Sequence, residues 1–425
     1  MHIERRTLLR TGGLLAVAAS LPLPFIFGRA GRSSPSGLRP DPAKILDLAP
    51  GFSYRVLERA GEPMSDGFVV PGSPDGMGCF ALGPRRWALL RNHELSSGDP
   101  SGPSGPSAPA ASYDRNAPGC VTRLVVDSEK LERVSSNLVL AGTLRNCAGG
   151  ISPWGWLSCE ETVERGHGYV FLCPSDATSV SRPNRVTSYG RFNHEAAVVD
   201  PKTLVAYLTE DRGDGCLYRF VPADVSRPFA GRLQAMKLEG APRFDCSELR
   251  LGERRKLGWV DVPNPDPADD SVRSQALERG AASVRRGEGA WFHGDTLYFA
   301  STSGGKNHLG QVFRLTVERE NRAGTLELLA ASTSPDALDG PDNLVVAPWG
   351  DVVIAEDGND DQFVRGLTPD GRIYDIARNA RSRGELAGVC FSPDGRALFF
   401  NSQRDGLTVA VAGPWQSLRR NARPI

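Results

Sequence analysis

The stretch Gly388-Val-Cys-Phe-Ser-Pro-Asp-Gly-Arg-Ala-Leu-Phe-Phe400 holds two short apolar runs joined by a Pro-Asp-Gly turn. Short apolar runs bounded by Gly, Pro, Asp or Asn predict β-strands, and Pro-Asp-Gly favours a tight turn between them. The same turn signal occurs at Ser73-Pro-Asp-Gly76 and Thr368-Pro-Asp-Gly371, where we expect two further hairpins. The stretch therefore predicts an antiparallel hairpin and sets the pattern for the rest of the chain.

Similar runs continue along nearly the whole chain after the N-terminal segment, with almost no convincing amphipathic helix between them. The chain has 47 glycines and 32 prolines among its 425 residues, which indicates many turns. One flat sheet of this length would expose its edges, whereas a radial array of four-stranded blades protects them. We therefore expect an all-β fold, a six-bladed β-propeller with long connecting loops, for which five or seven blades would also fit. Among the clearest runs are Trp87–Leu90, Val121–Val126, Leu204–Leu208, Thr296–Ala300 and Val352–Ala355.

The charge balance excludes some classes of function. Lys and Arg number 50, as do Asp and Glu, so the formal net charge is +0. Nucleic-acid binding favours a basic excess, so we expect no nucleic-acid partner. The eight cysteines include no Cys-x-x-Cys pair, which argues against a zinc ribbon. Their number permits disulfides, but the sequence leaves the pairing open.

The N-terminus is typical of an export signal. Arg5-Arg6 precedes an apolar run from Leu14 to Phe27, and small residues follow near Ala30. This order predicts a twin-arginine signal peptide over residues 1–30, followed by a single propeller domain over 31–425. Pro22 and Pro24 interrupt the run, so we expect no stable membrane span after the signal is removed. The expected location is the periplasm or the exterior, the expected export partner is the twin-arginine machinery, and we expect a monomer.

Acidic motifs lie beside glycine or tryptophan at the ends of several predicted strands. A propeller needs no such motifs, and a single acidic pair is usually a solvated turn. Loops from one end of successive blades meet at the propeller axis, however, and many carboxylates converge there only if cations neutralise them. Oxygen ligands suit Ca²⁺ or Mg²⁺, and a thiolate with carboxylates suits iron. The motifs are Arg91–Glu94, Asn146–Gly150 with Pro153–Glu161, Gly190–Ala196, Thr209–Gly215, Arg285–Trp291 and Pro341–Asn343 with Pro348–Gly358.

At these motifs the chain resembles the PhoX-type alkaline phosphatases. The most specific string is Asn146-Cys147-Ala148-Gly149-Gly150, which continues through Pro153-Trp154-Gly155 to Cys159-Glu160-Glu161. The resemblance implies a six-bladed propeller exported by the twin-arginine pathway. It also implies a site of two Fe³⁺ and three Ca²⁺ around a bridging oxygen that hydrolyses phosphomonoesters. This chain departs from the family pattern by lacking a residue between Gly155 and Trp156.

The resemblance also implies roles for particular residues. Cys147 would be the thiolate ligand of iron, and Glu195, Glu288 and Asp342 would be carboxylate ligands of metal. Arg286 would face the substrate phosphate, so that Arg286 and Glu288 are the expected catalytic residues. Weaker candidates for calcium binding or for roles behind the ligands are Glu94, Glu160, Glu161, Glu210, Asp211, Glu356 and Asp357.

Three functions are compatible with the sequence. The first is an alkaline phosphatase-like hydrolase of phosphomonoesters that uses Ca²⁺ and Fe³⁺. The second is another metal-dependent hydrolase, such as a phosphodiesterase, a phytase-like enzyme or a lactonase, because propellers host many reactions. The third is a calcium-binding propeller without catalytic activity.

Overall fold

The computed structural model describes residues 37–425 except 106–108, 110 and 319–322. The predicted signal peptide, 1–30, lies outside the described residues, so the signal and its boundary stay predictions. Among the described residues, strands dominate, and the single α-helix is α1 (Val272–Glu278). No helix in the described ranges is both long enough and apolar enough to cross a membrane. The predicted all-β class is therefore confirmed.

Two sheets are simple antiparallel meanders of four strands. In each, consecutive strands pair in chain order, as short connections favour. The strands are β3 (Pro74–Ala81), β4 (Arg86–His93), β5 (Gly119–Asp127) and β6 (Glu132–Thr143), and then β7 (Asn146–Ser152), β8 (Gly155–Glu160), β9 (Val170–Cys173) and β10 (Asn184–Val186).

The middle of the chain forms one sheet of nine strands. It contains two four-stranded runs, and β15 joins them because it pairs with both β14 and β19. The strands are β11 (His194–Val199), β12 (Ala206–Glu210), β13 (Tyr218–Pro222), β14 (Gly231–Leu238), β15 (Arg254–Asp261), β16 (Gly287–His293), β17 (Thr296–Ser301), β18 (Gln311–Glu318) and β19 (Ala323–Ala331).

The last two sheets combine the two ends of the chain. The N-terminal strands β1 and β2 pair with the C-terminal strands β23 and β26. The strands are β20 (Pro341–Val346), β21 (Val352–Glu356), β22 (Phe363–Leu367) and β23 (Arg372–Asn379) with β1 (Leu46–Leu48) and β27 (Arg423–Pro424), and then β24 (Leu386–Phe391), β25 (Ala397–Ser402) and β26 (Leu407–Ala412) with β2 (Ser53–Arg59).

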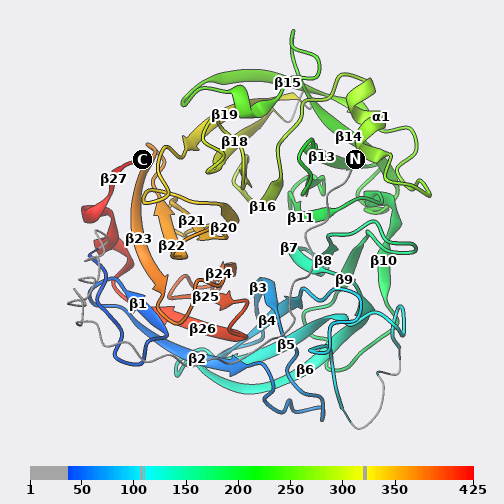
Figure 1. Ribbon diagram of the computed structural model, residues 1–425. Helices are drawn as coiled ribbons and strands as arrows, with labels where there is room; N and C mark the ends of the chain where they lie inside the picture. The colour runs from blue at the N-terminus through cyan, green and yellow to red at the C-terminus, as the bar shows by residue number, and fades with distance from the viewer. Residues whose placement is uncertain (1–36, 106–108, 110, 319–322) are drawn as a thin grey trace, which may run out of the picture. The chain divides into compact units, whose positions relative to one another are not determined.

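The first strands of the repeating units lie around a common centre (Figure 1). β3, β7, β11, β16, β20 and β24 contact one another in this order, and β24 contacts β3 again. The arrangement is that of a β-propeller. Hydrogen bonding among the described residues nevertheless defines five sheets, not six separate blades, because β15 fuses two of the four-stranded runs.

Apolar layers between neighbouring sheets hold the ring together. Trp87 of β4, for example, packs edge-on against Phe399 of β25 at 6.0 Å between ring centroids. Strands near the centre are covered on both sides, and every residue of β11 and β20 is buried. Their side chains therefore pack on both faces.

Two of the three predicted Pro-Asp-Gly hairpins are confirmed. Thr368–Gly371 joins β22 to β23, and Ser392–Gly395 joins β24 to β25, each closed by a turn hydrogen bond. The prediction at Ser73–Gly76 is wrong, because Pro74 pairs with His93 and opens strand β3. Proline is tolerated as the first residue of a strand, so the same residues serve a strand start as readily as a turn.

Candidate metal centre

All six central strands carry the same irregularity near their N-terminal ends. On β3, Pro74 pairs with His93 and Met77 with Arg91, so two residues lie opposite Asn92 alone. This is a β-bulge, and bulges re-aim side chains next to functional sites. The first residue of the bulge is Asp75 in β3, Cys147 in β7, Glu195 in β11, Glu288 in β16, Asp342 in β20 and Gly388 in β24.

The second bulge residue is small in most of these strands, and this lets the strands approach closely. A Cβ on Gly76 would lie 2.5 Å from the Cα of Ala148, and a Cβ on Gly289 would lie 2.6 Å from the Cα of Asn343. Such distances are far below van der Waals contact. The close packing of the bulges brings the side chains of their first residues together at the axis.

A second set of acidic residues follows the second strand of several units. In three acidic pairs, the first residue ends the strand and is held by several hydrogen-bond donors of the protein. Glu160 accepts hydrogen bonds from His167 Nδ1 at 2.6 Å and from the amide of Gly168 at 2.8 Å. Such contacts leave little capacity for a metal, and these first residues belong to none of the metal-compatible groups among the described residues.

The other two pairs behave in the same way. Glu210 pairs with Arg273 at 2.8 Å and accepts from the hydroxyl of Tyr218 at 2.8 Å. Glu356 pairs with Arg365 at 2.6 Å and accepts from the amide of Phe363 at 3.2 Å. The predicted candidates Glu160, Glu210 and Glu356 therefore stabilise the strand ends and are not members of the metal-compatible groups among the described residues. Their neighbours Glu161, Asp211 and Asp357 interact electrostatically with the central acids.

In the part of the chain that the structure describes, three linked groups of side chains could each hold a metal ion. They are Cys147 with Glu161 and Glu195, Glu195 with Glu288 and Asp342, and Asp75 with Asp342 and Glu385. Within each group, one donor atom per residue lies within 4.8 Å of the others. Glu195 and Asp342 are each shared by two groups, so the three form one continuous centre.

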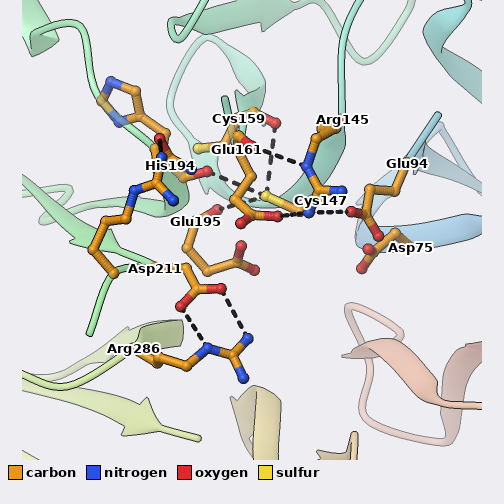
Figure 2. A network of polar contacts seen from close by, with 12 residues as sticks. Asp75, Glu94, Arg145, Cys147, Cys159, Glu161, His194, Glu195, Asp211 and Arg286 are labelled. Atoms are coloured by element: carbon orange, nitrogen blue, oxygen red, sulfur yellow. Dashed lines mark hydrogen bonds and ion pairs between the residues drawn. The ribbon is translucent and has the colours of Figure 1, made fainter. Parts of the chain in front are cut away.

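Nine carboxylates and one thiol make up what we call the central cluster. Its members come from every part of the ring, and Figure 2 shows how the labelled ones point toward one another. The members are Asp75, Glu94, Cys147, Glu161, Glu195, Asp211, Glu288, Asp342, Asp357 and Glu385.

All four predicted metal ligands, Cys147, Glu195, Glu288 and Asp342, belong to the cluster. Sequence reasoning missed Asp75 and Glu385. Asp75 lies in the Pro-Asp-Gly stretch interpreted as a turn. Glu385 has no motif of its own, but it precedes the central strand whose bulge begins with Gly388, the one bulge without a side chain. The carboxylate comes instead from three residues upstream.

Burial and mutual repulsion make the central cluster electrostatically unfavourable without cations. Burial, followed by the charges of Asp342 and Glu161, raises the pKa of Glu195 well above its usual range. Burial and Glu195 do the same to the pKa of Glu288. Burial and Asp357 raise the pKa of Asp342 to about 7. Carboxyl groups in this position must bind protons or positive charges.

The thiol of Cys147 is buried at the edge of the cluster. Its Sγ lies 3.2 Å from the carbonyl oxygen of His194 (Figure 2), and burial together with Glu195 raises its pKa well above the usual value. A bound metal ion reverses this preference, because a coordinating thiol loses its proton. The donor set of one thiol and many carboxylates therefore fits a metal centre.

Two arginines pair with members of the cluster (Figure 2). Arg286 donates two hydrogen bonds of 2.8 Å to Asp211 and a longer one of 3.3 Å to Glu288. Arg145 contacts Glu94 at 2.7 Å and also pairs with Glu161. The hydrogen bond to Asp211 is the main cause that raises the pKa of Arg286, so the guanidinium stays charged.

Comparison with known families gives one extensive match. The family model described as alkaline phosphatase PhoX matches residues 34–406. No curated protein sequence is similar enough to the chain to be matched with it.

Solved structures that superpose on the chain include one strong match and two weaker ones. PhoX of Pseudomonas fluorescens in complex with vanadate, described as a transition-state analogue, superposes with a TM-score of 0.70 at 18% identity. The match covers 87% of this chain and 96% of that one. A gluconolactonase of Xanthomonas campestris gives a TM-score of 0.42 at 12% identity, covering 83% and 99%. The propeller domain of Cps50 from Myceliophteria thermophila gives 0.44 at 12% identity, covering 84% and 99%.

Proposed function

Because the chain belongs to the alkaline phosphatase PhoX family, we propose that it hydrolyses phosphomonoesters with a calcium- and iron-containing centre. The observation that carries this proposal is the linkage of three metal-compatible groups through Glu195 and Asp342. An isolated acidic pair is common on protein surfaces. A buried chain of shared carboxylates ending in a thiol is not, and its charge requires several cations.

The proposed metal ligands follow from the donor chemistry. Cys147, with Glu161 and Glu195, would hold iron, because a thiolate suits iron and not calcium. Asp75, Asp342 and Glu385 offer only oxygen and would hold calcium. The chemistry supplied by such ions is neutralisation of the phosphate and stabilisation of the charge that develops on the leaving oxygen. Glu288 joins the two regions, since its group shares Glu195 with the first and Asp342 with the third.

Arg286 is the proposed phosphate-binding residue. Its side chain is 42% exposed, whereas those of its partners Asp211 and Glu288 are 11% and 7% exposed. The arginine therefore extends from buried acids toward solvent, where a substrate arrives. Its planar group suits the oxygens of a phosphate. Asp211 would fix the orientation of the guanidinium before the substrate binds.

The proposal includes a six-unit ring and export from the cytoplasm. We count the nine-stranded sheet as two blades fused by β15, since β11 and β16 each begin a four-stranded run with its own bulge. The Arg5-Arg6 motif supports export as a folded protein through the twin-arginine pathway. Export after folding would allow iron to be inserted in the cytoplasm.

The test uses the full chain exported with its own signal. We expect hydrolysis of 4-nitrophenyl phosphate at alkaline pH, loss of turnover with a chelator, and both iron and calcium by elemental analysis. Glu288→Gln should lower turnover at least ~100-fold, because metal ions contribute several kcal/mol to stabilising the transition state. The exposed Glu129→Gln serves as the control. A metal-loaded chain that cleaves no phosphomonoester, or that cleaves bis(4-nitrophenyl) phosphate or a lactone faster, would contradict the proposal.

A further inference from the structure

Arg145 is wedged between two acids of the central cluster. Its Nη2 lies 2.7 Å from Glu94 Oε1 and pairs with Glu161 Oε2, while its Nε donates to the Glu161 carbonyl at 3.0 Å. Figure 2 shows the guanidinium between the two carboxylates. One positive group therefore contacts both acids, as a divalent ion would.

The backbone fixes Arg145 in this position from both sides. Its amide donates to the carbonyl of Leu95, next to Glu94, at 3.0 Å. Its carbonyl accepts from the amide of Glu161 at 2.9 Å. The residue has a φ of 46°, a left-handed conformation that is uncommon outside glycine. The loops of the two acids therefore hold the arginine backbone as well as its side chain.

The side chain of Glu94 is surrounded by hydrogen-bond donors of the protein. It belongs to none of the three metal-compatible groups found among the described residues. Its carboxylate meets Arg145 and accepts a hydrogen bond of 2.9 Å from Gln403 Nε2. These donors are supplied by the protein, so Glu94 meets a positive charge without an ion.

Arg145 keeps its charge in this environment. Burial alone would lower the pKa of the guanidinium, but the charges of Glu94 and Glu161 outweigh burial and raise it. An arginine is in any case protonated at all pH values relevant to proteins. The positive charge between the two carboxylates is therefore permanent.

We propose that Arg145 is a built-in cation that occupies the position between Glu94 and Glu161 where a divalent ion would otherwise bind. The centre of this chain is then complete with one divalent ion fewer than its carboxylates would hold without Arg145. The inference rests on the proposed function only in assuming that the cluster binds metal. Arg145 then supplies one positive charge that would otherwise come from a metal ion.

The experiment counts calcium ions on the full chain. Parent and variants are equilibrated with calcium chloride alone, freed of unbound ion by gel filtration and measured by elemental analysis. We expect Arg145→Met, which removes the charge and keeps most of the stem, to bind one more calcium per chain than the parent. Arg145→Lys keeps the charge and should bind the parent number. Arg85→Met, which breaks an exposed pair with Glu129, is the matched control.

The same calcium number in Arg145→Met and in the parent would overturn the proposal. An arginine that instead bound substrate would show this result together with a higher KM. If Arg145→Met fails to fold, Glu94→Gln provides the second measurement. A glutamate neutralised by arginine can be replaced without loss of an ion, whereas loss of one calcium in Glu94→Gln would overturn the proposal. Ion counts need no substrate, so an inactive parent would contradict only the proposed function.

Discussion

Arg286 and Asp211 form a two-pronged ion pair, with both hydrogen bonds 2.8 Å long, across 75 residues of sequence. Asp211 follows the end of β12 and Arg286 precedes β16, so the pair connects two neighbouring units of the ring. Paired, parallel hydrogen bonds fix both the position and the plane of a guanidinium. The conformation of Arg286, with a φ of 47°, is held at the same time by the hydrogen bond from its amide to the Arg212 carbonyl.

Weakening this pair should impair substrate binding. We expect Asp211→Asn to raise KM for 4-nitrophenyl phosphate about tenfold with a smaller effect on kcat, because a charged hydrogen bond contributes roughly 1.5–3 kcal/mol. Asp224→Asn is the control, since Asp224 forms an exposed pair with Arg227. Steady-state kinetics with metal analysis of both variants provide the measurement. An unchanged KM at unchanged metal content would show that Asp211 does not position Arg286.

Substitutions in the acidic pair Glu356–Asp357, at the end of β21, should affect stability and metal binding separately. Glu356→Gln should cost about 3 kcal/mol in unfolding free energy, because Arg365 loses one of its two buried acidic partners. It should leave the metal content unchanged. Asp357→Asn should weaken calcium binding with a smaller effect on stability, because the charge of Asp357 acts on the ligand Asp342. Denaturant unfolding in chelator and elemental analysis distinguish the two variants. If Glu356→Gln instead lowered the calcium content and Asp357→Asn instead lowered the stability, the proposed roles of the two residues would be wrong.

Without bound metal, the stability of the folded protein should decrease as the pH rises toward neutrality. In the metal-free fold the pKa of Glu161 and that of Asp342 are each raised to about 7, first by burial. The folded state then holds protons that the unfolded chain releases above about pH 4. The stability that these two groups contribute is present below that pH and is lost as pH rises through about 7.

We therefore expect the Tm of the chelator-treated chain to fall between pH 5 and pH 8. Asp342→Asn should flatten this decline, because the amide does not titrate. Added calcium should raise the Tm more at pH 8 than at pH 5, since it binds the deprotonated carboxylates. A metal-free Tm that rises over this range, with the same slope in Asp342→Asn, would be inconsistent with the raised pKa values.

The close packing of the bulges predicts intolerance to a single methyl group. In Gly76→Ala the new Cβ would lie 2.5 Å from the Cα of Ala148 and 2.6 Å from the carbonyl oxygen of Cys147. We expect a loss of about 1–3 kcal/mol in stability and a reduced iron content, because β3 must move away from β7. Gly258→Ala in β15, where no atom lies within 4 Å, is the matched control. Equal iron content in both variants would show that the close packing of β3 against β7 does not affect iron binding.

The strands were predictable from the sequence because their apolar runs match buried faces directly. Val352–Ala355 and Ala397–Phe400 are fully buried in β21 and β25. The number of separate sheets was harder to predict from the sequence. Two four-stranded runs join into one sheet because β15 pairs with β19, and no local sequence pattern encodes that pairing.

The candidate site was predictable only in part. Cys147, Glu195, Glu288 and Asp342 carry recognisable motifs, but the pairs Glu160–Glu161, Glu210–Asp211 and Glu356–Asp357 are ambiguous in sequence. Which residue of a pair reaches the centre depends on where its strand ends. Asp75 was missed because the same residues can begin a bulged strand or form a turn. Glu385 was missed because its carboxylate takes the place of the side chain that Gly388 lacks.

The seam between the two chain ends determines when the centre can exist. β2 pairs with β26, so Ser53 lies opposite Ala412, and the group of Asp75, Asp342 and Glu385 is drawn from both sides of that seam. A ribosome must therefore finish nearly the whole chain before these three carboxylates meet. A chain that ends before Glu385 lacks one member of this group, so the complete centre forms only late in synthesis.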